Sequence, residues 1–351
     1  MDAPLRAVPG GGRGREGGLS EEPPPPAAAA VEPPAPGLER LGRRLGVPLL
    51  LALLALVGLV LVADAEKLAA ELARFDLWLL LPVLGLSLIN YTLRWLRWEI
   101  YLARLGVRLP RPRSLAVFLV GFLLGITPGK AGELGKAWII RELGGGPARR
   151  VVPAVLAERV TDLAGALLLL APGALTLPGG PWIAAAALAS AAALVLLLTW
   201  RRAAVRVFAL LGRLPLVGRR MHMLAELYDG VRDLISPGRL ELGLVLAMVA
   251  WGAEGMGFWL VIREYDPSAG ALLALFNYTA STCLGGLSVL PGGLVAVEGM
   301  LTALLDSQGL STAAAASATL IIRAATLWFA VLLGLAALPF VGHWLRRRRR
   351  G

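Results

Sequence analysis

The chain has 351 residues, 57% of them hydrophobic, and its mean hydropathy is +0.69. These values exclude a soluble domain and indicate an all-α, polytopic helical membrane protein. The formal net charge of +11 gathers between apolar runs, so it reports topology and predicts no nucleic-acid partner. A single cysteine, Cys283, excludes an internal disulfide, and the two histidines are far apart, so we expect neither a metal nor another cofactor.

Residues 1–40 are rich in Gly, Pro and Ala, which predicts a disordered cytoplasmic tail and not a signal peptide. The first two predicted spans are Val47–Ala63 and Leu77–Leu93, joined by an external, acidic-leaning loop. Arginines flank the pair on both outer sides, and by the positive-inside rule both clusters are cytoplasmic. They are Arg40, Arg43 and Arg44 before the first span, and Arg94, Arg97, Arg104, Arg108, Arg111 and Arg113 after the second.

A Pro-Gly break interrupts the next apolar run. Leu115–Thr127 has 13 residues, too few for a helix that crosses hydrocarbon, which needs roughly 20. The polar stretch Ile126–Glu142, ITPGKAGELGKAWIIRE, follows and holds Lys130 and Lys136, two of only three lysines. Because exposed irregular backbone cannot face lipid, we predict a re-entrant or broken helix that enters from the cytoplasm and lines a site. The alternative is an ordinary cytosolic loop.

Three more spans are predicted at Val151–Leu175, Trp182–Trp200 and Leu240–Ile262, the last with Glu254 inside it. The first two of these are joined by an uncharged external turn. The basic segment 201–239 is cytoplasmic, and its LAELYDGVRDLI portion predicts an amphipathic helix, either at the lipid headgroups or as a solvated linker.

The apolar run Gly270–Leu290 ends in a second break, Leu290–Gly299, which we expect to enter from outside. A last span, Ser311–Gly342, is followed by Arg346–Arg350, a cytoplasmic stop signal. Both termini are therefore predicted to be cytoplasmic, with six crossings. The two interrupted segments are then either re-entrant or cross as hairpin pairs.

One motif occurs in both halves of the chain. A Pro-Gly dipeptide leads to a glutamate, and an arginine follows that glutamate after 26 residues in the first half and 25 in the second. Corresponding elements run in opposite senses, which predicts an inverted repeat with a site near the membrane midplane. The motif residues are Pro128, Gly129, Glu133 and Arg159, and then Pro291, Gly292, Glu298 and Arg323.

Ionisable residues inside spans cost about 2.5–3.5 kcal/mol each on insertion scales and therefore indicate function. Glu158, Arg159 and Asp162 share one span, and we expect them to compensate one another in part. Lys130 or Lys136 is expected to neutralise the remaining negative charge. The alternative is that these residues form salt bridges that only hold helices together.

Arg323 in the last span similarly predicts a pair with Glu298. Helices can begin near Gly132 and Val295, just after the two breaks, so their free N–H groups and positive dipole ends would point into the breaks. Lys130 adds a mobile cation. Together these features predict a phosphate or carboxylate site in the membrane, and an anionic lipid headgroup is the ligand that needs both this site and access to lipid.

At these residues the sequence resembles the flippase-like family defined by the membrane region of lysylphosphatidylglycerol synthases. The matching pieces, over about residues 45–342, are RWLRWE at Arg94–Glu99, PGKAGELGKAW with AERVTDL at Ala157–Leu163, and LPGG with Glu298 and IIRAATLWF at Ile321–Phe329. The resemblance implies a multi-pass protein of the bacterial cytoplasmic membrane, with a flippase-like transmembrane domain at 41–345 and a basic tail at 346–351.

The resemblance also implies site residues, to which Lys130 is added from the residue analysis above. They are Pro128, Gly129, Gly132, Glu133, Glu158, Arg159, Asp162, Pro291, Gly292, Gly293, Glu298 and Arg323. The sequence departs from the family at Val295–Val297, where another glycine commonly precedes the glutamate.

We therefore expect a flippase-like protein, not an enzyme, that translocates or presents the headgroup of an anionic phospholipid or a polyprenyl-linked glycolipid. The chain ends soon after the last span, so the aminoacyl-transferase domain of the synthases, and with it lipid lysylation, is not expected. One alternative is a non-transporting partner of a lipid-dependent glycosyltransferase. Another is an integral-membrane lipid transferase, which would need metal-binding carboxylates such as DxD that the sequence does not offer.

Overall fold

The computed structural model of the protein describes residues 64–211, 221–235, 238–288 and 290–350, together with positions 50, 54, 57, 58 and 61. All regular secondary structure in these residues is helical, which confirms the predicted all-α class. The predicted tail 1–40 and most of the first predicted span lie outside the described residues.

Four helical runs in the described part of the chain are long and apolar enough to cross a membrane. They are η1 with α3 (Leu77–Leu79 and Leu80–Arg104), α7 (Gly180–Thr199), α11 (Arg239–Tyr265), and α14 with η4 and α15 (Thr312–Arg323, Ala324–Trp328 and Phe329–Arg350). A further helix of 27 residues, α6 (Ala148–Ala174), contains the three clustered ionisable residues. These helices match the predicted spans, and they confirm a polytopic membrane protein.

The second span differs from its prediction at its end. Helix α3 does not stop at Leu93 but continues to Arg104. Arg97, assigned above to a cytoplasmic cluster, is only 1% exposed, and the side chain of Arg94 is 11% exposed. That assignment was wrong for these two arginines, because Asp162 of α6 supplies a counter-charge inside the protein. The loop before this span also differs, since it contains an amphipathic helix, α2 (Ala65–Arg74), capped by Asp64.

The first Pro-Gly break forms a short helical hairpin, which we call the first hairpin. Its limbs are α4 (Arg111–Leu124) and α5 (Gly135–Glu142), and the turn η2 (Pro128–Leu134) is its tip. Gly129 and Lys130 have φ of 60° and 55° there, a left-handed backbone that reverses the chain. Limbs of 14 and 8 residues are too short to cross hydrocarbon, so the segment is re-entrant and not a cytosolic loop.

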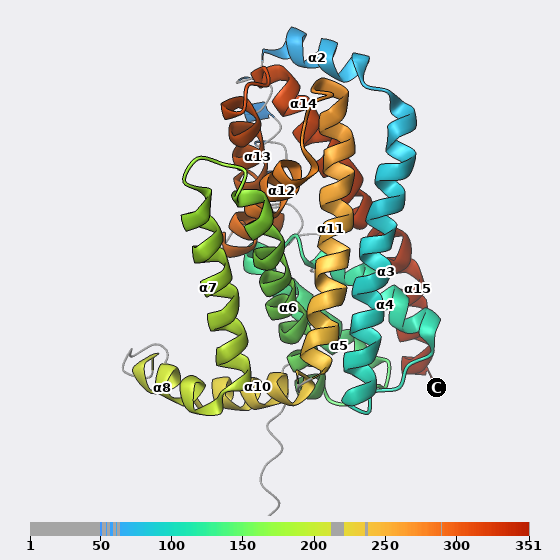
Figure 1. Ribbon diagram of the computed structural model, residues 1–351. Coiled ribbons are helices and arrows are strands. Elements are labelled where there is room, and N and C mark those ends of the chain that lie inside the picture. The colour runs from blue at the N-terminus through green and yellow to red at the C-terminus, as the bar shows by residue number, and fades with distance from the viewer. Residues whose placement is uncertain are drawn as a thin grey trace, which may run out of the picture. The chain divides into compact units, whose positions relative to one another are not determined.

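The second break forms a matching second hairpin. Its limbs are α12 (Ala271–Leu287) and α13 (Ala296–Ser307), and η3 (Pro291–Gly293) is its tip. In Figure 1 this hairpin lies in the upper half, near α2, whereas the first hairpin lies in the lower half, near α10. The two tips contact each other, and Ile126 packs with Leu294 in one apolar cluster. Opposite entry with meeting tips is the inverted arrangement that the sequence predicted.

Two helices lie across the lower end of the bundle, at a steep angle to α7 and α11 (Figure 1): α8 (Arg201–Leu211) and α10 (Met221–Leu234). The predicted amphipathic helix corresponds to α10, which buries Val231 and Leu234 in the core beneath α6. The C-terminal end of α15 reaches the same end of the bundle (Figure 1).

Candidate functional site

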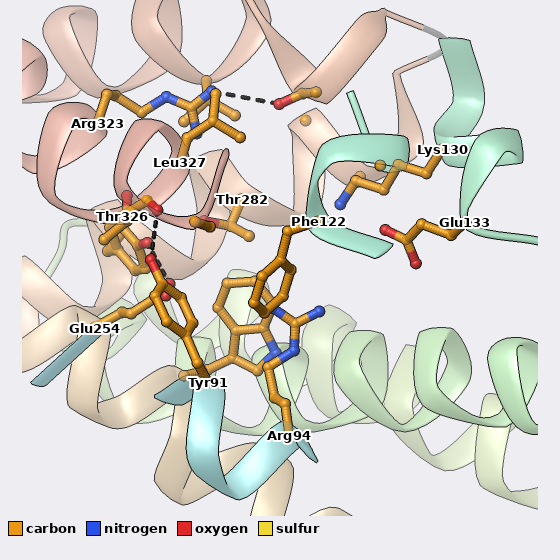
Figure 2. Close-up of a pocket in the computed structure, with 18 of the residues that line it drawn as sticks. Tyr91, Arg94, Phe122, Lys130, Glu133, Glu254, Thr282, Arg323, Thr326 and Leu327 are labelled. Carbon is orange, nitrogen blue, oxygen red and sulfur yellow. Dashed lines mark hydrogen bonds between the residues drawn. The ribbon is translucent and has the colours of Figure 1, made fainter. Parts of the chain in front are cut away.

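A cavity of about 110 Å³ lies where the two hairpin tips meet. Its lining comes from both hairpins and from α3, α6, α11 and the α14–α15 run (Figure 2). Four lining side chains are cations, and two are carboxylates. The cations are Arg94, Lys130, Arg159 and Arg323, and the carboxylates are Glu133 and Glu254. A volume of this size holds several water molecules or one phosphate-sized group, and the excess of cations favours an anion.

The first hairpin is fastened to α6 by two ion pairs. Arg159 donates to Glu133 in the tip, and Lys136 Nζ donates to Glu158 Oε2 at 2.6 Å. The Lys136 amine also lies 4.3 Å from the ring centroid of Trp98, and both partners in its pair are buried. Lys136 and Glu158 are absent from the cavity lining, so their pair holds the hairpin in place, whereas Glu133 and Arg159 face the cavity.

Asp162 is held from the other side, by α3. Arg97 donates to its Oδ1, and the Arg94 guanidinium lies 3.5 Å from its Oδ2. The trio of α6 was predicted to compensate itself in part, with Lys130 or Lys136 neutralising the rest; in the described structure each member forms its ion pair with another element, and Lys136 is the lysine that pairs with Glu158. The side chains of one helix face point outward to different neighbours, so the counter-charges come from α3 and from the first hairpin.

Among the residues of the second half that the structure describes, one buried ion pair of this kind occurs, and it is the predicted one. Arg323 Nε donates to Glu298 Oε1 at 2.6 Å. The same guanidinium donates through Nη2 to the carbonyl oxygen of Gly292 at 3.3 Å, so it also contacts the tip of the second hairpin. Arg323 and Gly292 line the cavity, and Glu298 stands behind Arg323.

The tip glycines shape the backbone, and the N–H groups of Gly132 and Gly293 are already bonded within the tips. The N–H of Gly132 donates to Thr127 Oγ1 at 2.6 Å, and a Cβ at Gly132 would come equally close to that oxygen. Beyond Gly129 and Lys130 the turn η2 is helical and runs into α5 at Gly135, so a helix does start near Gly132 as predicted, but the N–H of Gly132 is not free. At the second tip, Gly292 and Gly293 have positive φ, and a Cβ on Gly293 would lie 3.0 Å from the Cα of Gly285, so the tip packs closely on α12.

Several cavity residues were not assigned from the sequence. Arg94 is the main one: its guanidinium lies 5.2 Å from the ring centroid of Phe122 and 5.6 Å from that of Trp251. These contacts hold a cation at the cavity wall. The sequence did indicate that the helix continues past Leu93, because Tyr91, Arg94 and Trp98 follow one another at helical spacing across the predicted end of the span.

Two hydrogen bonds between neighbouring helices complete the lining of the cavity (Figure 2). The hydroxyl of Tyr278 on α12 donates to Glu254 Oε2 on α11 at 2.6 Å. The hydroxyl of Tyr91 donates to the carbonyl oxygen of Thr326 at 2.5 Å. Thr326 lies in η4, a π-helical turn within the last span, and such turns are frequent at functional sites.

These features define a class: multi-pass helical membrane proteins in which two inverted re-entrant hairpins enclose a charged cavity. The family model described as the lysylphosphatidylglycerol synthase TM region matches residues 49–334, and the chain belongs to that family. This confirms the resemblance noted in the sequence.

Two curated relatives cover nearly the whole chain. Both are described as UPF0104 membrane proteins of Methanothermobacter thermautotrophicus. One is 22% identical over 322 residues, which is 84% of this chain and 94% of the relative. The other is 25% identical over 311 residues, 81% of this chain and 90% of the relative.

Proposed function

We propose that the protein binds an anionic lipid headgroup in the cavity and moves or presents it between the two leaflets, without catalytic chemistry of its own. The observation that carries the proposal is Lys130. It lies at the tip of the first hairpin, lines the cavity, and makes no ion pair with any residue that the structure describes. Its amine points into the cavity in Figure 2. An uncommitted cation at membrane depth is costly unless it has an anionic ligand.

The hairpins suggest how the headgroup would pass. Each hairpin is tied to a neighbouring helix by one pair whose arginine lines the cavity, Glu133–Arg159 in the first half and Glu298–Arg323 in the second. In the proposed cycle a bound phosphate competes for one arginine at a time, so one hairpin loosens while the other stays closed. Such alternation around a fixed midplane site is the usual scheme for inverted repeats.

We further propose a cytoplasmic-membrane location with both termini in the cytoplasm. Helices α8 and α10 and the end of α15 lie at one end of the bundle (Figure 1), and their arginines include Arg201, Arg202 and Arg346. The positive-inside rule places that end in the cytoplasm. The ligand would be an anionic phospholipid or a polyprenyl-linked glycolipid, and a lipid-modifying enzyme is the expected partner.

The proposal is tested with the full chain in liposomes that contain fluorescent phosphatidylglycerol, whose outer-leaflet label is quenched chemically. Lys130→Gln is expected to slow translocation by about ten- to a hundredfold, since a hydrogen bond to a charged group contributes about 1.5–3 kcal/mol. Lys67→Gln is the matched control, because this lysine on α2 has a side chain 74% exposed.

Two results would contradict the proposal. One is a folded Lys130→Gln variant that translocates at the wild-type rate, which would remove Lys130 from the site. The other is wild-type protein that translocates no faster than empty liposomes and retains no phosphatidylglycerol on purification, which would remove this lipid as the ligand.

A further inference from the structure

One buried carboxylate is held differently from the others. Five carboxylates in the described residues are buried, and four of them form ion pairs with lysine or arginine: Glu133, Glu158, Asp162 and Glu298. The fifth is Glu254, in the middle of α11, which is 5% exposed and lines the cavity. Its partner is the phenol of Tyr278, and no lysine or arginine of the described chain lies within ion-pair distance.

The cations around Glu254 are engaged elsewhere. The helices packed against α11 contribute Tyr91 and Arg94 from α3, Asp162 from α6, Tyr278 from α12 and Arg323 from α14. Arg94 lies against Asp162 and two aromatic rings, and Arg323 is bonded to Glu298 and to the second tip. Lys130, Glu133 and Arg159 complete the charged lining of the cavity. A buried carboxylate without a paired cation has no counter-charge to hold it ionised, so a further negative charge beside it favours proton uptake.

We propose that Glu254 is a proton-binding site coupled to anion binding in the cavity, so that Glu254 carries a proton whenever the headgroup occupies the cavity. The coupling rests on the proposed function, because it needs an anion in the cavity. A phosphate there lies beside Glu254, and two negative charges repel strongly in a site of low dielectric constant. A proton taken up from cavity water removes this repulsion and turns Glu254 into a donor toward a phosphate oxygen.

The same proton would act on the second hairpin. Tyr278 belongs to α12, so its hydrogen bond to Glu254 ties this hairpin to α11. A hydrogen bond to an ionised carboxylate is roughly twice as strong as one between neutral groups. Protonation of Glu254 therefore loosens the tie, and deprotonation after the headgroup leaves restores it. The second hairpin is in this way the element whose movement the proton controls.

The proton site is tested first without any lipid. Infrared difference spectra of the purified full chain are recorded during a pH titration, and the protonated-carboxyl stretch is followed. We expect a titrating band in the wild type and in Glu241→Gln, and its loss in Glu254→Gln. Glu241 is a matched control, since it is an exposed glutamate on the same helix. Gln at position 254 keeps an acceptor for Tyr278. Identical bands in all three proteins would overturn the proposal.

The coupling is tested with phosphatidylglycerol, whose phosphodiester stays singly charged near neutral pH. Wild-type affinity is expected to rise about tenfold for each pH unit lowered, with about one proton taken up per lipid bound. Glu254→Gln is expected to bind at one affinity across this range, and Glu241→Gln to behave as the wild type. Proton uptake is read with a pH indicator in weak buffer, and this measurement needs no variant.

The outcomes separate the two proposals. Binding without proton uptake, or equal pH dependence in wild type and Glu254→Gln, overturns the coupling and leaves the lipid function standing. A wild type that binds no phosphatidylglycerol at any pH overturns the function for this lipid and the coupling with it, while the infrared titration still decides whether Glu254 binds a proton.

Discussion

The first hairpin and the second hairpin enter from opposite ends and meet at their tips, yet the buried charges around them are distributed unequally. Around the first, α6 contributes three ionisable side chains that pair with the hairpin and with α3. Around the second, only Glu298–Arg323 forms a comparable pair among the described residues. The path of the chain is thus repeated in inverted form, but the buried ion pairs are not repeated with it. We expect the first hairpin to be held more firmly and the second hairpin to be the easier one to displace.

The largest expected effect is in the first half. Asp162→Asn leaves the guanidinium of Arg97 buried without its counter-charge, and arginine cannot escape by losing its proton. The free energy of unfolding should fall by about 3–5 kcal/mol. The measurement is unfolding of the purified protein in mixed micelles of increasing SDS content. Asp233→Asn, at an exposed position on α10, is the control and should change little. A loss below about 1 kcal/mol would contradict the expectation that the first hairpin is held more firmly.

An intermediate effect is expected in the second half. Glu298→Gln removes the charge opposite Arg323, but that arginine lines the cavity, where water can hydrate it. The expected loss is about 1.5–3 kcal/mol in the same assay, less than for Asp162→Asn. Glu264→Gln, exposed near the end of α11, serves as the control. Equal losses in the two halves would break the proposed asymmetry.

The smallest effect has the opposite sign. Val295 precedes α13 with φ of 71°, a region that a β-branched residue rarely adopts. Val295→Gly should raise the free energy of unfolding by about 0.5–1 kcal/mol. The relief of about 1–2 kcal/mol of backbone strain outweighs the additional conformational entropy that glycine loses on folding. Val295→Ala should give no such gain. A loss of stability with glycine would show that this backbone is not strained.

Both hairpins could be predicted from the sequence, but part of the cavity lining could not. Pro-Gly breaks identified both tips, the first of them beside an apolar run too short to cross, and the Glu298–Arg323 pair followed from the cost of an unpaired arginine. Arg97 was misplaced because counting arginines near a span cannot reveal Asp162, 65 residues away, as the partner that buries it. Gly132 was misjudged because only the local geometry shows that Thr127 already accepts from its N–H.

The π-helical turn η4 has a consequence for the last crossing. It directly follows Arg323, and it places one extra residue in the turn that joins α14 to α15. Tyr91 of α3 bonds the carbonyl oxygen of Thr326 within that turn. The last membrane-spanning helical run therefore has an irregular turn along its length, and α3 is hydrogen-bonded to that turn. Because Arg323 also contacts the tip of the second hairpin, displacement of that hairpin would bend the last helical run at this turn.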